Sequence, residues 1–206
     1  MKPLILRMKA FGSYGKETTI DFTKPTQNLF LITGDTGAGK TTIFDAIVFA
    51  LYGQASSSYN KKDGVLLQSH FVAFEEKPSV EFTFAESVTE QAPVYKIVRV
   101  PKHLRPMKRR GKTGKEFAEE KGSVELFLPD GSAYPEKNID EKIEGIIGLT
   151  REQFMQVAMI AQGEFMELLR AKTDDKKEIF RKLFNTEIYE KIRRILEERK
   201  KQKEKE

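Results

Sequence analysis

The chain of 206 residues is long enough for one sizeable hydrophobic core or for two small ones. It has no cysteine, which excludes disulfides, thiolate metal sites and cysteine nucleophiles, and no stretch approaches the roughly 20 apolar residues that span a membrane. The net charge is +5, and together these features predict a soluble intracellular protein without a membrane segment, as fits a reducing cytosol.

The first predicted element is a pair of strands joined by a turn. In LILRMKAF, residues 4–11, apolar side chains alternate with other residues as they do along a half-buried strand. Gly12, Ser13 and Gly15 favour a turn, and TTIDF at 18–22 has the composition of a second strand. We therefore expect a hairpin-like pair at the N-terminus.

A strand, a glycine-rich loop and a helix are predicted next. Residues 28–33, NLFLIT, form an almost continuous apolar run, which is typical of a strand buried on both faces. After the loop GDTGAGKTT at 34–42, apolar residues recur at helical spacing from Ile43 to Leu51, and Gly53 is a suitable helix end.

This loop fits the pattern G-x-x-x-x-G-K-[ST] of phosphate-binding loops. Its glycines would let backbone N–H groups point at a phosphate chain, Lys40 would reach the β and γ phosphates of ATP, and Thr41 would ligate Mg²⁺. The helix would direct its positive dipole end at the same anion. The alternative is a glycine-rich turn without a ligand. The predicted nucleotide-binding residues are Gly34, Asp35, Thr36, Gly37, Ala38, Gly39, Lys40, Thr41 and Thr42.

Three strands with alternating polarity are predicted at residues 79–85, 95–100 and 123–128. A basic stretch, residues 102–115, joins the second to the third, and its prolines and glycines favour a loop or hairpin tip over a helix. It contains seven cations and no acid, so the positive charge of the chain is local. The cations are Lys102, Arg105, Lys108, Arg109, Arg110, Lys112 and Lys115. Charged hairpin tips are usually just solvated.

The last third of the chain reads as helical. One helix is predicted from Lys137 onward, ending near Gly148, and a second begins at the capping residue Thr150 and runs through Ile160. From about residue 174, apolar residues at mixed three and four spacing outline a coiled-coil seam. The final ten residues contain no apolar side chain, so the segment is either a frayed, solvated end or the start of a longer helix.

Hydrolysis of a nucleotide needs more than a phosphate-binding loop, because an acid on a neighbouring strand must help to hold Mg²⁺. The adjacent Asp140 and Glu141 do not follow a buried strand, and Asp130 has the surroundings of a hairpin turn. The two histidines, His70 and His103, are interpreted as structural or surface residues. The sequence therefore predicts half of a catalytic site.

Three segments together resemble a known family. The stretches GDTGAGKTTIFDAIVFALYG, QVAMIAQGEFMELLRA and TEIYEKI are similar to the N-terminal ATPase half of the SbcC family, the bacterial SMC-like DNA repair ATPases of the ABC class. Thr36 with Thr41 and Thr42, and the QGEF continuation, favour this family over RecF and SMC relatives. The resemblance implies an α/β fold: a P-loop NTPase lobe of ABC/SMC type at 1–186, with an antiparallel β subdomain and a helical Q-loop region, and the truncated start of a coiled coil at 187–206.

The resemblance also implies where the missing half lies. In this family the second acidic motif, the signature motif and a late histidine follow a long coiled coil with a cysteine-containing zinc hook, so we expect this chain to be an N-terminal fragment. Gln162 matches the family's Q-loop glutamine, which contacts Mg²⁺ and water near the γ-phosphate; Lys40 and Gln162 are the implied catalytic residues, and Thr41 and Gln162 the implied metal ligands. Relatives place Arg where this chain has Gly12, so Phe11 and Tyr14 are either base-stacking or core residues.

The function implied by the resemblance is an ATPase that uses ATP and Mg²⁺ to act on double-stranded DNA. Two heads would dimerise across ATP and drive an SbcD-type nuclease, bound near the coiled-coil exit, on DNA ends in the bacterial cytoplasm and nucleoid. The basic stretch would then contact DNA phosphates without sequence preference. We expect the fragment alone to be inactive. The alternatives are another SMC or RecF-like ATPase, a self-contained P-loop kinase or GTPase, and a nonenzymatic nucleotide-dependent DNA-binding module.

Overall fold

The computed structural model describes residues 1–24, 31–55, 67–107, 116–158 and 187–203. The chain forms two compact units, Met1–Gly148 and Leu149–Glu206. Several predicted features lie outside the described residues: the first half of the apolar run at 28–33, the centre of the basic stretch at 108–115, and the segment 159–186 that contains Gln162.

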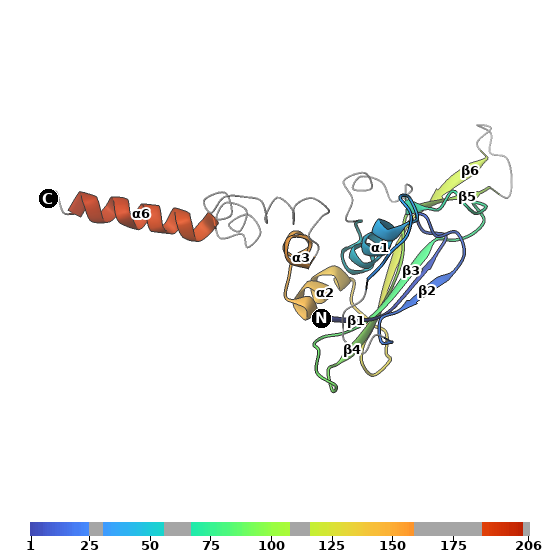
Figure 1. Ribbon diagram of the computed structural model, residues 1–206, viewed down its shortest axis with the longest axis horizontal. Helices are drawn as coiled ribbons and strands as arrows, with labels where there is room; N and C mark the ends of the chain where they lie inside the picture. The colour runs from blue at the N-terminus through green and yellow to red at the C-terminus, as the bar shows by residue number, and fades with distance from the viewer. Residues whose placement is uncertain (25–30, 56–66, 108–115, 159–186, 204–206) are drawn as a thin grey trace. The chain divides into compact units, whose positions relative to one another are not determined.

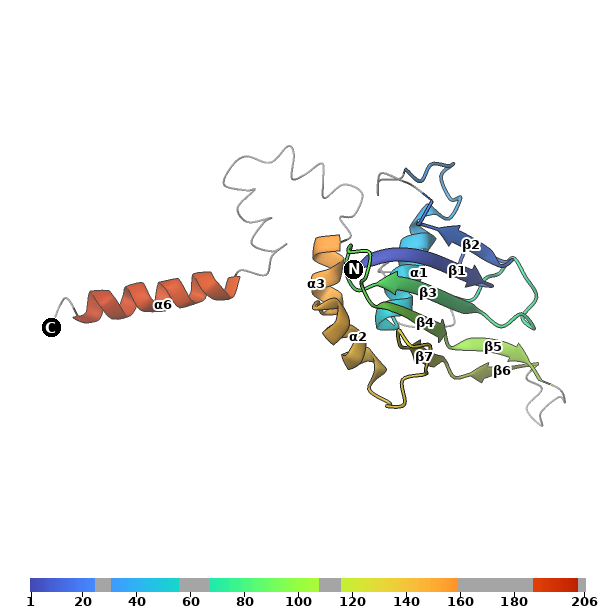
Figure 2. The same ribbon diagram turned by 90° about the horizontal axis from the view of Figure 1, so that it is seen from below.

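The first unit is built on a five-stranded antiparallel sheet with the strand order β2-β1-β3-β4-β7 (Figures 1 and 2). Its strands are β1 (Lys2–Lys9), β2 (Thr18–Asp21), β3 (Ser79–Ala85), β4 (Val94–Val100) and β7 (Ser123–Phe127). The predicted N-terminal pair and all three later strands are therefore confirmed. The structure is a mixed α/β fold with an antiparallel sheet, which is the coarse part of the predicted fold class.

One face of the sheet is the core. Leu6, Phe82, Ile97 and Leu126 are opposite one another on β1, β3, β4 and β7, and each is fully buried. This apolar row forms because alternate residues of a strand point to the same face. The other face carries polar pairs, such as the 3.1 Å ion pair between Arg7 Nη1 and Glu81 Oε1. The alternation of apolar and polar residues in the sequence therefore predicted correctly which side chains of these strands face the core.

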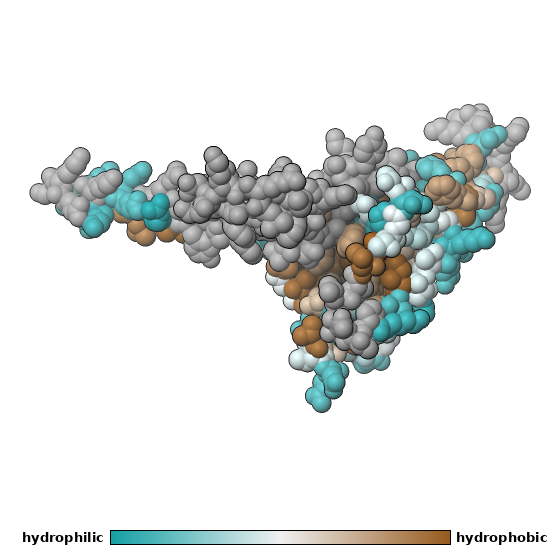
Figure 3. Space-filling view, in the orientation of Figure 1, coloured by the Kyte–Doolittle hydropathy of each residue, from teal (hydrophilic) through white to brown (hydrophobic). Residues whose placement is uncertain are grey.

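Helix α1 (Lys40–Tyr52) contacts β3 and β4 and lies on the same side of the sheet as α2 (Ile139–Ile147), as both ribbon views show. The predicted helix after the loop is confirmed, including its end, where Gly53 has φ 72° and donates its N–H to Phe49 O at 2.8 Å. Phe44 of α1 does not join this core, since it is 42% exposed. The space-filling view shows hydrophobic surface in the region of α1 and α2 (Figure 3).

The predicted strand at 28–33 is wrong for the residues that can be described. Leu31, Ile32 and Thr33 are not in a strand, and Leu31 is 86% exposed. A continuous apolar run becomes a buried strand only when neighbouring strands pair with both of its edges. The strands of the described sheet are other segments of the chain. The run is apolar, as the prediction required, but none of the described strands pairs with Leu31, Ile32 or Thr33.

The two ends of the basic stretch flank a separate pair of strands. Strands β5 (His103–Pro106) and β6 (Phe117–Glu120) form a two-stranded antiparallel sheet, as the arms of a hairpin would, while the predicted loop or hairpin tip at 108–115 lies outside the described residues. The amide of Gln68, which is 2% exposed, donates to Leu104 O at 3.0 Å and accepts from Leu104 N at 2.9 Å. His103 is buried, and its Nδ1 lies 3.0 Å from Pro101 O. The structural interpretation of this histidine is therefore confirmed.

Gln68 gives a stability prediction. Because its amide satisfies both backbone groups of Leu104, Gln68→Ala would leave a part-buried N–H and C=O without these partners. We expect the free energy of unfolding to fall by about 1–3 kcal/mol, the usual cost of an unsatisfied buried polar group. Urea unfolding measures it, with Gln91→Ala at an exposed position as the control, for which about 0.5 kcal/mol or less is expected. Equal effects of the two changes would contradict the assigned role.

The helices after the sheet also follow the predictions. Helix α2 ends at Gly148, which has φ 74° and donates its N–H to Glu144 O at 2.7 Å. Helix α3 (Arg151–Ala158) begins with a reciprocal cap: Gln153 N donates to Thr150 Oγ1 at 3.4 Å, and Thr150 N donates to Gln153 Oε1 at 2.9 Å. The predicted capping residue Thr150 is confirmed.

Helix α6 (Glu187–Lys203) continues through most of the charged tail, so the helical reading of that tail holds as far as Lys203. Ile192, Ile195 and Leu196 form a stripe at helical spacing and are about half exposed. The coiled coil itself stays a prediction. None of the described helices is long and apolar enough to cross a membrane.

Candidate nucleotide-binding site

The predicted phosphate-binding loop is an exposed turn that leads directly into α1. Gly37 and Gly39 have φ values of 85° and 89°, which side chains other than glycine rarely adopt. Ala38 N donates to Asp35 O at 3.1 Å and closes the turn. A Cβ added at Gly37 would meet nothing within 4 Å, whereas one at Gly39 would lie 3.0 Å from Ser13 Cβ. Gly37 therefore faces open space, and Gly39 faces the protein.

Lys40 folds back over this loop. Its Nζ donates to Gly34 O at 2.7 Å and to Asp35 O at 2.8 Å, and both contacts are exposed to solvent. The ammonium group is thus held at the loop by carbonyl oxygens, which carry only partial negative charge. Phosphate oxygens carry full charge and form stronger bonds with an ammonium donor. The side chain is placed where an anion in the loop would replace these carbonyl contacts.

The start of α1 adds a second feature that suits an anion. Its N-cap is Gly39, no side chain caps the helix there, and the first turn contains no acidic residue. The first-turn N–H groups and the positive end of the helix dipole are therefore not committed to a carboxylate of that turn. The glycine-rich loop, Lys40 and this helix end together fit a phosphate chain.

Thr41 and Thr42 are not equivalent. Thr41 is exposed, whereas Thr42 is partly buried and its Oγ1 lies 3.3 Å from Ser13 Oγ. A threonine that ligates a metal at the loop needs a hydroxyl that can point at the ion. The predicted metal-binding role therefore suits Thr41, as the sequence pattern also indicates.

The turn at residues 10–15 is a part of this site that the sequence patterns did not assign. Tyr14 Oη lies 3.4 Å from Gly39 O, and a Cβ at Gly12, where φ is 52°, would lie 2.6 Å from Thr42 Cγ2. Burial raises the pKa of Tyr14 above its ordinary value, so its hydroxyl stays protonated and can donate at neutral pH. These contacts join positions 25 and 30 apart in sequence, and the only local signal was the glycine turn itself.

The same turn shows whether Phe11 is a base-stacking residue or a core residue. Phe11 is fully buried, and its ring centroid lies 5.5 Å from that of Phe49. Core packing is therefore the role of Phe11, and base stacking by this residue is excluded. Tyr14 is only partly buried and lies beside Gly39, at the edge of the loop.

The acids considered for metal binding take part in local structure. Asp130 accepts hydrogen bonds from Ser132 Oγ at 2.7 Å and Ser132 N at 2.9 Å, and these bonds hold the pKa of the Asp130 carboxyl below its ordinary value. It lies in a turn, as predicted. Asp140 forms an ion pair with Arg99. Within the described ranges, no group of three or more His, Asp or Glu side chains could hold a metal ion.

The positive charge of the basic stretch is partly neutralised by acidic residues from outside it. Lys102 Nζ lies 2.8 Å from Glu119 Oε2, and Arg105 Nε lies 3.0 Å from Glu120 Oε2. The hairpin brings these acids of β6 back beside β5, which a count along the sequence from 102 to 115 misses. The other five cations of the stretch, and Gln162, lie outside the described residues. Lys102 and Arg105 are thus partly neutralised by acidic partners, which makes them poorly suited to bind DNA phosphates.

Comparisons with known proteins show the family to which the chain belongs. A sequence family described as an AAA domain matches residues 6–206. The SbcC subunit of the nuclease SbcCD from Staphylococcus epidermidis is 39% identical over 206 residues, covering 98% of this chain and 19% of the relative. The corresponding Vibrio cholerae protein is 37% identical over 204 residues (97% and 19%), and that of Lactococcus lactis is 32% identical over 198 residues (92% and 18%). The resemblance to SbcC proteins is confirmed, and the chain spans about a fifth of their length.

Proposed function

The chain belongs to the AAA domain family, and from this premise we propose that it is the N-terminal nucleotide-binding lobe of an ATP-dependent DNA repair ATPase. The observation that carries the proposal is the arrangement of Lys40. Its ammonium lies on the carbonyl oxygens of Gly34 and Asp35, beside a helix start that has no side-chain cap. A loop that only reversed the chain direction would not need a lysine ammonium group over its own carbonyl oxygens.

The residues of the loop divide the work of binding ATP. Backbone N–H groups from Gly34 to Gly39 would surround the phosphates, Lys40 would neutralise the β and γ phosphates, and the Thr41 hydroxyl would hold Mg²⁺. Mg²⁺ would supply further neutralisation of the phosphate charge. Gln162 offers both a donor and an acceptor without adding charge, which suits a residue that orients water beside the γ-phosphate.

The remaining parts of the proposal rest on the resemblance to SbcC proteins, and the names of the relatives, each a subunit of a nuclease, support only the nuclease partner. We propose that a C-terminal lobe of the same protein completes the site, that two heads dimerise across ATP, and that an SbcD-type nuclease binds near the helix α6. The exposed stripe of α6 is consistent with the start of a coiled coil. The lobe would comprise residues 1–186 and the coiled coil would begin at 187.

Calorimetric titration with ATP and Mg²⁺ tests the proposal directly. We expect one ATP for each chain, with weaker binding when Mg²⁺ is removed by a chelator, because Thr41 binds the nucleotide through the metal. Adenosine serves as the control ligand, since it lacks the phosphates that the loop contacts and should not bind measurably. A folded chain that binds neither ATP nor ATP with Mg²⁺ would refute the proposed function.

The basic stretch gives a prediction about DNA. Replacing Arg105, Lys108, Arg109 and Arg110 with glutamine should weaken duplex binding and flatten its dependence on salt. Each lost phosphate contact is expected to reduce the slope of log K against log salt by about 0.9. Since Arg105 is paired with Glu120, Arg105→Gln alone should change the slope by less than the value of about 0.9 for a full phosphate contact.

Fluorescence anisotropy across a salt series measures this slope. The matched control neutralises the same number of exposed cations elsewhere in the first unit: Lys24, Lys77, Lys121 and Lys137. This control should lower the affinity only slightly. If both quadruple variants reduce the slope equally, the basic stretch is an ordinary solvated hairpin and only the overall charge matters.

A further inference from the structure

The peptide unit at the start of α1 is held from outside the glycine-rich loop. Tyr14 donates its hydroxyl to Gly39 O at 3.4 Å, and its ring packs on the same residue, since a Cβ added at Gly39 would lie 3.3 Å from Tyr14 Cε2. Gly39 is the N-cap of α1, and Lys40 is the first residue of the helix. Tyr14 therefore contacts the junction between the loop and the helix with both its hydroxyl and its ring.

The orientation of this peptide decides where one N–H group at the helix start points. No peptide bond among the described residues is cis, so the C=O of Gly39 and the N–H of Lys40 point in opposite directions. With the carbonyl oxygen held toward Tyr14, the Lys40 N–H is directed away from Tyr14. The N–H groups in the first turn of a helix have no partner within the helix, so that of Lys40 stays available to an anion in the loop.

The loop itself does not fix this orientation firmly. Gly39 has φ 89°, and glycine has more backbone freedom than any other residue, so the peptide that follows it rotates more readily than one that follows a residue with a Cβ. No side chain caps α1 at this point. Tyr14 therefore supplies the contact that favours one orientation over the others.

Tyr14 can act in this way because its own backbone is fixed to the core. Phe11 N donates to Tyr14 O and Tyr14 N donates to Phe11 O, both at 2.8 Å. Phe11 is fully buried, with its ring centroid 5.5 Å from that of Phe49 in α1. The turn that carries Tyr14 is thus packed against the same helix whose first peptide Tyr14 holds.

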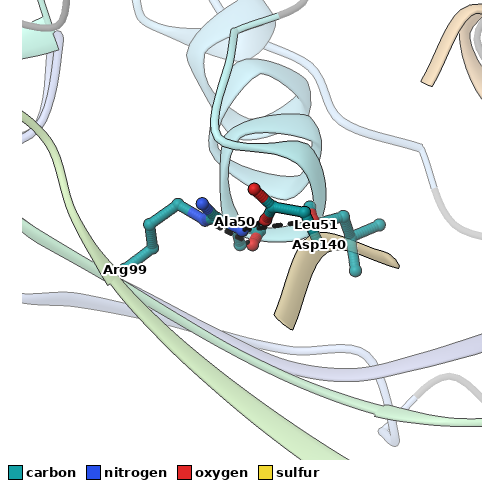
Figure 4. Close-up of polar contacts among 4 residues, drawn as sticks. All are labelled: Ala50, Leu51, Arg99 and Asp140. Atoms are coloured by element: carbon teal, nitrogen blue, oxygen red, sulfur yellow. Dashed lines mark hydrogen bonds and ion pairs between the residues drawn. The ribbon is translucent and has the colours of Figure 1, made fainter. Parts of the chain in front are cut away.

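The far end of α1 has its own anchor, so the helix does not depend on Tyr14 for its position. Arg99 Nε donates to Ala50 O at 3.0 Å, and Arg99 Nη2 lies 3.4 Å from Leu51 O and donates to Asp140 Oδ1 at 2.6 Å (Figure 4). The guanidinium group thereby joins the last turn of α1 to β4 and to the first turn of α2. Loss of the Tyr14 hydroxyl is therefore expected to change the junction and to leave the helix in place.

We propose that Tyr14 is a positioning residue for the phosphates of ATP, and that it acts by orienting the N–H of the Gly39–Lys40 peptide toward them. This rests on the proposed function. A residue of this kind does not touch the nucleotide, so its effect falls on the phosphate contacts. Base stacking, the alternative role of Tyr14, would instead act on the adenine and leave the phosphate contacts unchanged.

Tyr14→Phe tests this role most directly, because it removes the hydroxyl and keeps the ring that packs on Gly39. The matched control is Tyr134→Phe, which removes a hydroxyl that donates to Glu136 Oε2 at 3.1 Å and to Asn138 Oδ1 at 3.3 Å. Each variant loses one tyrosine hydroxyl. The hydroxyl of Tyr14 contacts the loop, whereas that of Tyr134 contacts its own segment before α2.

The measurement is calorimetric titration of the full chain with ATP and, separately, with inorganic tripolyphosphate, both in the presence of Mg²⁺, together with the melting temperature. We expect Tyr14→Phe to raise the dissociation constant for ATP by about two- to tenfold, the effect of one neutral hydrogen bond. The dissociation constant for tripolyphosphate should rise by the same factor. Tyr134→Phe should change neither constant, and the two variants should shift the melting temperature by similar small amounts.

An unchanged ATP affinity of Tyr14→Phe would overturn the proposal. So would weaker ATP binding with unchanged tripolyphosphate binding, because Tyr14 would then contact the nucleoside. A parent chain that binds ATP but not tripolyphosphate would overturn it as well, since phosphate contacts would then contribute too little of the affinity.

The melting temperature separates positioning from a general structural role. A fall in melting temperature for Tyr14→Phe that clearly exceeds that for Tyr134→Phe would indicate the structural role and refute positioning. If the parent chain bound no ATP, the proposed function itself would fail and the positioning role with it. Binding by the parent together with an unaffected Tyr14→Phe variant would refute only the positioning role.

Discussion

Replacing Lys40 with alanine is expected to abolish measurable ATP binding without unfolding the chain. Hydrogen bonds to charged partners contribute about 1.5–3 kcal/mol each, and the ammonium group has two acceptors at the loop that phosphate oxygens would replace. Loss of two such contacts weakens binding by at least about a hundredfold. Calorimetric titration with ATP and Mg²⁺ measures the effect.

The fold should be unaffected because Lys40 contributes little packing. Its two hydrogen bonds are exposed to solvent, and surface substitutions of this kind change the free energy of unfolding by about 0.5 kcal/mol or less. Urea unfolding of Lys40→Ala provides this check, and Lys77→Ala at an exposed position controls for the loss of one positive charge. Retained ATP affinity in a folded Lys40→Ala chain would show that the loop is an ordinary turn.

Features that depend on neighbouring residues in the sequence were predictable. The helix caps at Thr150 and Gly148, and the turn at Asp130, are set by interactions within four residues of chain. The alternation in β3 and β4 reported correctly which side chains face the core. Local patterns also placed Lys40 at the start of α1, because the phosphate-loop motif is itself a short stretch.

Features that depend on distant residues were not predictable. Arg99 binds carbonyl groups almost 50 positions earlier, and Gln68 pairs with Leu104, so no spacing along the chain identifies either contact. The acids of β6 neutralise Lys102 and Arg105 only because the hairpin folds back. The strand predicted for the apolar run ending at Thr33 was wrong because a strand is buried only when neighbouring strands pair with it. Those neighbours cannot be identified from the run itself.

Hydrolysis gives the second large effect: the chain alone is expected to bind ATP with Mg²⁺ but to turn it over negligibly. Lys40 and Thr41 supply phosphate and metal contacts, yet P-loop hydrolysis also needs an acid that helps to hold Mg²⁺ and a group that orients water. The two acids considered for that role are engaged elsewhere, Asp130 with Ser132 and Asp140 with Arg99. Steady-state phosphate release should stay near background and should appear when a C-terminal lobe is added.

Gln162→Ala sharpens this test in the assembled protein. A residue that orients water and Mg²⁺ contributes mainly in the transition state, so its loss should lower turnover more than it weakens ATP binding. Lys40→Ala, in contrast, should remove binding itself, and the two variants therefore separate the two halves of the site. Robust hydrolysis by the purified chain alone, abolished by Lys40→Ala so that contaminating enzymes are excluded, would show that the chain contains its own catalytic acid and would favour a self-contained P-loop enzyme.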